Sequence, residues 1–306
     1  MCSLYKLLTI NMKKGILLSL ALVAFVGAAA VGATGAFFSD TETSTGNTFT
    51  AGAIDLRVDS QQHYNNAICV PNPSETIGDY WWQLEVGANP QQDQYPVIGS
   101  PCTGTWDLTD LGPAHKFFNF GDVKPGDQGE NTVSLHVQNN PAYACVDITT
   151  TANDENTLIE PETTAGDVTV GPIGDGELAG NVKFQAWLDQ GATSGFQGED
   201  TGEGDNLWQV GEPALANGAL SQLVNNTLTL TLADGQSGTP IAPGVTNYVG
   251  LFWCAGTVTG GAGNLGCDGS TMGNTAQTDS ATADVTFRVI QTRNNSSFDC
   301  TPQLEV

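Results

Sequence analysis

The residues best suited to bind a ligand lie in an acidic, glycine-rich run at positions 189–206. Its acidic members are Asp189, Glu199, Asp200, Glu203 and Asp205. Calcium takes about six to eight oxygen ligands, and glycine permits the backbone turns that gather carboxylates and carbonyls around one ion. The run therefore predicts a calcium site, although its spacing is not that of an EF-hand. A plain solvated acidic loop is the alternative interpretation.

Motifs for catalysis are scarce in this sequence. It contains no His-Glu-x-x-His, no Gly-x-Ser-x-Gly and no phosphate-binding glycine loop. The three histidines, His63, His115 and His136, are scattered, and no cysteine has a histidine placed near it. Paired carboxylates arise by chance in a chain with 33 acidic residues, so they give a glycosidase little specific support. We therefore expect a protein that is not an enzyme, and we assign no catalytic residues.

Residues 1–35 have the three parts of a cleavable signal peptide. Lys13 and Lys14 form the basic start, an apolar run follows from Ile16 to Val31, and small residues precede Gly35. A retained membrane anchor is the weaker alternative, because the run is short and no basic stop follows it. Cleavage after Gly35 would make Ala36 the new N-terminus. With no second apolar segment of spanning length, we expect a secreted protein that leaves the membrane after cleavage.

Removal of the signal peptide takes away Cys2 and leaves six cysteines. An even number in an exported chain indicates disulfides, and six cysteines allow fifteen pairings. The preferred set is Cys69–Cys102, Cys145–Cys300 and Cys254–Cys267. A zinc site is the alternative, but it is poorly supported because no Cys-x-x-Cys occurs and the histidines are scattered.

The mature chain is strongly acidic. Its 33 acidic residues stand against 9 basic ones, and three of those bases, Lys6, Lys13 and Lys14, precede the cleavage site. The remaining 33 acids and six bases give a net charge of −27. Such a charge repels nucleic acid phosphates and anionic lipids, which excludes nucleic acid as a partner. It favours solubility, cation binding or a saline habitat.

Period-two alternation of apolar residues between glycine-, asparagine- and proline-rich turns predicts an all-β fold. The expected strands are Asn47–Val58, Phe117–Phe120, Thr132–Gln138, Cys145–Thr151, Val182–Leu188, Thr227–Leu232, Tyr248–Trp253 and Ala283–Gln291. About eight such strands predict one domain over 36–306, an antiparallel β-sandwich of jelly-roll type.

Two segments interrupt this pattern. Residues 59–111 hold two cysteines, several prolines and the pair Trp81 and Trp82, and we interpret them as a disulfide-closed insertion with its own aromatic cluster. Residues 153–180 are rich in Glu, Asp and Gly, which predicts a solvated loop. Exposed Trp81 and Trp82 would stack on sugar rings, but burial is the more frequent fate of tryptophan.

Several stretches together resemble the TasA and camelysin family. They are Met12–Gly15, Gly35–Asp40, Asn47–Leu56, Val123–Asp127, Val137–Asn140, Ala276–Ser280 with Phe287, and Gln291–Asn295. The segments 59–111 and 189–206 are not explained by the resemblance. The resemblance implies a signal peptide cleaved by a SipW-type signal peptidase. It also implies a jelly-roll subunit of a biofilm-matrix fibre or bundling pilus, at the cell surface or in the extracellular matrix.

In such fibres the freed N-terminal strand of one subunit completes the sheet of the next. The residues that would form this donor strand are Ala36, Phe37, Phe38, Phe49, Ile54 and Leu56. The alternative is that the same strand pairs within its own domain. The expected partner is therefore another copy of this chain, in a filament.

The sequence allows two other functions besides the fibre. Camelysin is described as a metalloprotease, but this sequence offers no recognisable zinc ligand set. A calcium-dependent carbohydrate-binding surface module would rest on Trp81, Trp82 and the run at 189–206. Calcium is the one cofactor that the sequence suggests.

Overall fold

The computed structural model describes residues 54–73, 79–88, 95–168, 175–198, 200–224, 226–236 and 239–300. All of them belong to one compact unit, Gly52–Val306. The signal peptide prediction for 1–35 therefore lies outside the described residues. So do the donor-strand residues Ala36, Phe37, Phe38 and Phe49.

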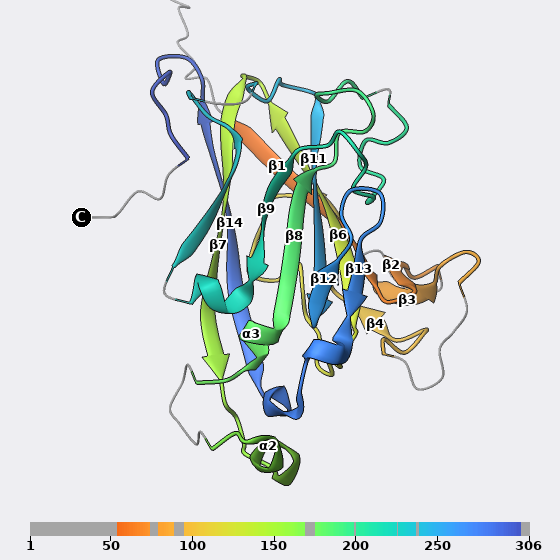
Figure 1. The fold of residues 1–306 in the computed structure, drawn as a ribbon. Coiled ribbons are helices and arrows are strands. Elements are labelled where there is room, and N and C mark those ends of the chain that lie inside the picture. Colours follow the sequence, from red (N-terminus) through yellow and green to blue (C-terminus); the bar gives the residue numbers. More distant parts are fainter. Residues whose placement is uncertain are drawn as a thin grey trace, which may run out of the picture. The chain divides into compact units, whose positions relative to one another are not determined.

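The larger of two main sheets contains nine antiparallel strands (Figure 1). Their order is β4 (Pro101–Cys102), β3 (Tyr80–Leu84), β2 (Ala67–Pro71), β1 (Asp55–Tyr64), β6 (Gln128–Gln138), β11 (Thr246–Ala255), β8 (Val182–Leu188) and β9 (Ala214–Ala219), and β5 (Trp106–Thr109) also pairs with β1. A separate hairpin is formed by β12 (Thr257–Thr259) and β13 (Gly266–Asp268).

The second main sheet has three antiparallel strands. Their order is β10 (Thr227–Ala233), β7 (Ala142–Asp154) and β14 (Ser280–Gln291). Val146 and Ile148 of β7 and Leu230 of β10 pack against Phe184 and Ala186 of β8 in one apolar core. The expected all-β antiparallel sandwich is confirmed. The chain passes repeatedly between the sheets, as at β6 to β7 and β9 to β10, which is the kind of connection found in jelly rolls.

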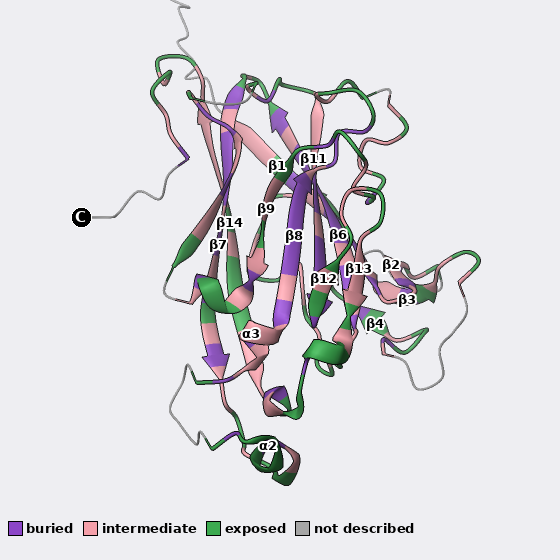
Figure 2. Cartoon of the chain, viewed as in Figure 1, coloured by how far each residue is buried: buried purple, intermediate pink, exposed green. Residues whose placement is uncertain are grey.

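Alternation along β6 explains why this strand lies in the middle of the larger sheet. Val133, Leu135 and Val137 turn toward the second sheet and are buried. Thr132 and Ser134 point to the opposite side and are buried as well, with 6% and 2% of their surface exposed. The outer face of the larger sheet is therefore covered too. Figure 2 shows the same burial along most of β8, whereas β14 is partly exposed.

The expected strand Phe117–Phe120 is not formed. The carbonyl of Phe117 accepts hydrogen bonds from the side-chain amides of Gln62 and Asn131, at 2.7 and 3.0 Å, instead of from a neighbouring strand. Its ring packs against Trp106 and Phe287. The aromatic residues that suggested a strand therefore act as core side chains on an irregular segment.

The segment 59–111 is not a separate insertion, contrary to expectation. It contains half of β1 and four further strands that extend the larger sheet. Trp82 is 4% exposed and shares a core cluster with Tyr64 and Trp253 of β11. Sheet pairing thus makes this segment part of the main domain.

Residues 153–180 are not simply a solvated loop either. Their described part holds two short helices, α2 (Glu160–Ala165) and α3 (Leu178–Asn181). Glu162 in α2 is fully buried, and its Oε2 accepts a hydrogen bond from the backbone N–H of Ile159 at 2.6 Å. Local capping of this kind satisfies backbone groups that a solvated loop would leave to water.

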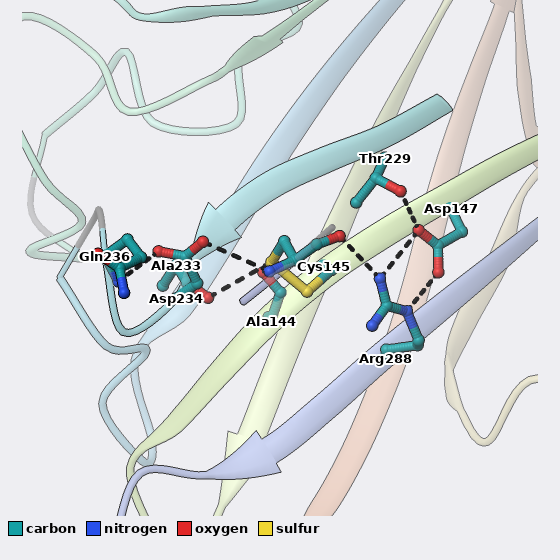
Figure 3. The surroundings of a disulfide bond; sticks show 9 residues. Ala144, Cys145, Asp147, Thr229, Ala233, Asp234, Gln236 and Arg288 are labelled. Carbon is teal, nitrogen blue, oxygen red and sulfur yellow. Dashed lines mark hydrogen bonds and ion pairs between the residues drawn. A yellow bond between two sulfur atoms is a disulfide. The ribbon is translucent and has the colours of Figure 1, made fainter. Parts of the chain in front are cut away.

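Three disulfides join the six cysteines and confirm the preferred pairings. They are Cys69–Cys102, Cys145–Cys300 and Cys254–Cys267. Beside Cys145, Arg288 pairs with Asp147 and donates to the carbonyl oxygen of Cys300 at 3.0 Å (Figure 3). Burial opposes ionisation of Asp147, but hydrogen bonds from Arg288 and Thr229 outweigh it and lower the pKa of this carboxyl. Three disulfides are typical of a chain that matures in an oxidising compartment.

Two of the three loops that these bonds close differ widely in length, which allows a test. Replacing both Cys145 and Cys300 by serine opens a loop with a sequence separation of 155. Replacing both Cys254 and Cys267 by serine opens a loop with a separation of only 13. In the chain-entropy model the first change lowers the free energy of unfolding by about 5 kcal/mol and the second by about 3 kcal/mol. Urea denaturation of the two double variants measures this difference, and equal losses would contradict the entropic account.

Candidate functional site

The acidic run at 189–206 lies on the outer face of the larger sheet. Asp189, directly after β8, is fully buried, and it accepts backbone hydrogen bonds from Gly204 at 3.1 Å and Asn206 at 2.9 Å. The side chain of Asn206 donates to Glu130 at 3.0 Å and accepts from the hydroxyl of Thr132 at 2.8 Å, both on β6. The run is therefore anchored to the sheet and is not a free loop.

The other described carboxylates of this run are also used by the chain itself. Asp200, Glu203 and Asp205 each accept two hydrogen bonds from nearby N–H groups. The donors are Thr193 and Gly202 for Asp200, Gln197 and Gly198 for Glu203, and Leu207 and Gln209 for Asp205. Glu199 lies outside the described residues. Calcium binding by this run stays a prediction, and the structure gives its described carboxylates a different task.

A second group of carboxylates lies where β7 ends and β14 begins, near α2 (Figure 1). Pairing of Ser280 with Asp154 brings the neighbouring residues Asp279 and Glu155 together. Among the described residues, two groups of three acidic side chains have oxygens within 4.8 Å of one another. They are Glu155, Glu162 and Asp279, and Glu155, Asp167 and Glu177.

Sequence reasoning missed this second group. Its members come from the end of β7, α2, the start of α3 and the residue before β14, so no local spacing links them. The only signal was the acidic composition of 153–180, which was interpreted as a sign of solvation. The group forms because β7 and β14 pair, which is a long-range contact.

Six acidic side chains among the described residues have a raised pKa, and burial is the largest cause in each; for four of them the pKa reaches about 7. The pKa rises to about 7 for Glu130 and Asp189 on the outer face of the larger sheet. It also rises to about 7 for Glu155 and Glu177 in the second group, where neighbouring carboxylates add to the effect. These groups lose their protons near neutral pH.

The second sheet ends in a long strand with one open side. Within the described residues, β14 pairs with β7 along its length and has no strand on its other side. Val285 and Phe287 of β14 are only half-buried, and with Val133 and Phe117 they line an apolar cavity of about 30 Å³ between the sheets. An unpaired backbone edge therefore lies beside an apolar lining.

Two of the predicted donor-strand residues belong to the chain's own domain. Leu56 lies in β1 and pairs with Val137 of β6. Ile54 and Leu56 both pack in a core cluster with Ala142 and Val289. Ile54 and Leu56 are therefore part of their own domain and not of the donor strand. The predicted donor segment is shortened to residues 36–53.

The tryptophans proposed for sugar binding do not form an exposed platform. Trp82 is buried in the core, and Trp81 is half-buried. Their adjacent positions on β3 point them to opposite faces of the sheet, so only one of them is near the surface.

Comparison with models of known protein families gave no match, and neither did comparison with curated protein sequences. No helix among the described residues is long and apolar enough to cross a membrane. The site must therefore be interpreted from its own geometry.

The partly buried carboxyl of Glu130 predicts a pH dependence of stability. Its pKa of about 7 exceeds the ordinary 4.5, so the folded state holds the proton more tightly and the wild-type protein loses stability as pH rises from about 5 to 8. Glu130→Gln removes this loss and should be more stable than wild type by about 1–3 kcal/mol at pH 8, with little difference near pH 5. Urea denaturation at both pH values measures it.

The exposed Asp110 provides a matched control for this measurement. Asp110→Asn should change the free energy of unfolding by less than about 0.5 kcal/mol at either pH. A stability difference for Glu130→Gln that is the same at pH 5 and pH 8 would show that ionisation of Glu130 is not its cause.

Proposed function

We propose that this chain is a secreted structural subunit of an extracellular fibre and that it assembles by strand addition. The observation that carries the proposal is the open side of β14. A strand of 12 residues offers its backbone beside the half-buried Val285 and Phe287. An exposed strand edge of this length can pair with a strand of another chain. Proteins that stay monomeric usually protect such edges against this pairing.

The proposed occupant is the segment 36–53 of a neighbouring copy. Its eighteen residues reach about 60 Å when extended, whereas a strand as long as β14 spans about 40 Å. The segment carries Phe37, Phe38 and Phe49 among serines and threonines, so alternate side chains can cover an apolar lining. Its sequence thus suits the open side of β14.

The disulfides and the signal peptide prediction support the extracellular part of the proposal. Three cystines suit an oxidising environment, and the expected cleavage after Gly35 would free the donor segment. The resemblance to TasA and camelysin proteins points to the same assembly. No catalytic residues are part of this proposal.

Deletion of residues 37–45 from the cleaved protein should leave a folded monomer that forms no filaments. The deletion leaves every described strand and all three disulfides in place, so the variant should still unfold cooperatively, while the apolar side chains needed for docking are lost. Negative-stain microscopy and thermal unfolding measure the two effects. The matched control replaces Thr41 and Thr43 by serine and should still form filaments. Persistence of filaments after the deletion would refute strand addition.

A synthetic peptide of residues 36–53 should inhibit filament growth in a dose-dependent way, because it would occupy the open side of β14. The control peptide carries Phe37→Asp and Phe38→Asp, which places charges against the apolar lining. Light scattering follows growth with each peptide. Equal inhibition by both peptides, or by neither, would contradict docking through these aromatic side chains.

A further inference from the structure

Basic residues are concentrated along the open side of β14, in a chain that has few of them. The expected mature chain carries six bases, and three of these lie on or beside β14: Lys116, Arg288 and Arg293. Arg288 is in the strand, and Arg293 follows its last residue by two positions. Lys116 precedes Phe117, whose ring packs against that of Phe287 in β14. Positive charge therefore borders β14 in a strongly acidic chain.

Two of these three bases have no acidic partner within the domain. Lys116 and Arg293 are exposed, and neither forms an ion pair with a described residue. The arginines and lysines that do form ion pairs each contact an aspartate, and they are Arg57, Lys124 and Arg288. Unpaired exposed cations can instead meet carboxylates of another chain, and such complementary charges set the register of an interface.

The charge along β14 changes sign from one end to the other. Asp279 directly precedes the strand and Asp284 lies in its first half, so this end is acidic. Arg288 lies in the second half and Arg293 just beyond the end. An incoming segment with charges of its own therefore prefers one direction, because opposite charges attract and like charges repel on neighbouring strands.

The proposed donor segment, residues 36–53, also carries its charges asymmetrically. Its only ionisable side chains are those of Asp40 and Glu42. The expected cleavage would add the positive amine of Ala36 in front of them. The segment thus begins with a positive charge and continues with two negative ones, whereas β14 begins acidic and ends basic. The two charge patterns are complementary when both strands run in the same direction.

The faces of the two strands match as well. In an extended strand Asp40 and Glu42 share one face, and Phe37 lies on the other. On β14, Phe287 turns toward the core, whereas Arg288 points to the outer face beside the Cys145–Cys300 bond (Figure 3). Phe37 can therefore face the apolar lining while both carboxylates remain on the outer face with the arginine.

The direction of docking follows from these two matches. In the parallel direction, Phe37 lies beside Val285 and faces the apolar lining. Asp40 is then level with Arg288, three residues further along both strands. In the antiparallel direction, the same contact would carry Asp40 toward the acidic start of β14. We propose that the two carboxylates of the incoming segment pair with Arg288 and Arg293 and so fix its direction as parallel to β14; this rests on the strand addition proposed above.

The test exchanges charges and follows filament growth of the cleaved full-length protein by light scattering. Arg293→Glu should raise the critical concentration for growth about 3–10-fold, because it places a negative charge against Glu42 of the neighbouring copy. Combining Arg293→Glu with Glu42→Arg should return the critical concentration to within about twofold of wild type. The matched control is Lys124→Glu, which makes the same change of charge at an exposed base in the turn before β6 and should grow as wild type does.

Salt separates an electrostatic role of Arg293 from a role in the fold. At 1 M NaCl the difference between Arg293→Glu and wild type should shrink, because charges are then screened over about 3 Å. The melting temperature of the variant should equal that of wild type, since Arg293 is exposed and has no ion pair in its own domain. A difference in growth that persists at 1 M NaCl would overturn the pairing.

Two results distinguish failure of this inference from failure of strand addition. If deletion of residues 37–45 abolishes filaments but Arg293→Glu grows as wild type does, strand addition stands and the charge pairing is overturned. The pairing is also overturned if Glu42→Arg does not restore growth to Arg293→Glu. If filaments persist after the deletion, strand addition itself is refuted, and the pairing with it.

Discussion

Burial of both faces of β6 is the constraint on which the rest of this structure depends. Val133, Leu135 and Val137 require a second sheet on one side, and β7, β10 and β14 provide it. Thr132 and Ser134 require a cover on the other side. The run at 189–206 supplies that cover through Asn206, while the β12–β13 hairpin covers Phe252 and Trp187 further along the sheet. A glycine-rich acidic segment is thus, first of all, part of the sandwich.

The alternation of apolar and polar residues predicted the strands whose two sides differ in polarity. Strand β8 was predicted at its observed limits, Val182–Leu188. It failed where long-range contacts decide the conformation. Phe117 has a strand-like sequence, yet its carbonyl accepts bonds from the side chains of Gln62 and Asn131. The strands β2 to β5 were missed because cysteines, prolines and tryptophans hide any alternation. Of the candidate sites, the presence of disulfides was predictable from an even cysteine count, although the count alone left fifteen pairings open. The meeting of Glu155 with Asp279 follows from a strand pairing that no spacing encodes.

The acidity of the chain therefore has more than one physical role. Some carboxylates replace missing backbone partners, as Asp189 does for Gly204 and Asn206. Others gather where strands from distant parts of the chain end, and there some of their oxygens have no N–H donor among the described residues. Amino-acid composition does not distinguish these two kinds of carboxylate, and it predicts a solvated surface for both. Burial and hydrogen bonding separate them.

The Cys145–Cys300 bond has a mechanical consequence. It closes a covalent loop that contains most of β7 and all of β8 to β14. Tension that enters the backbone before residue 145 and leaves after residue 300 passes through the sulfur atoms, so the strands inside the loop carry none of it along the chain. Under load, residues between Cys145 and Cys300 are shielded from the pull, as are those between Cys69 and Cys102, so that β14 keeps its register with the part of β7 inside the loop.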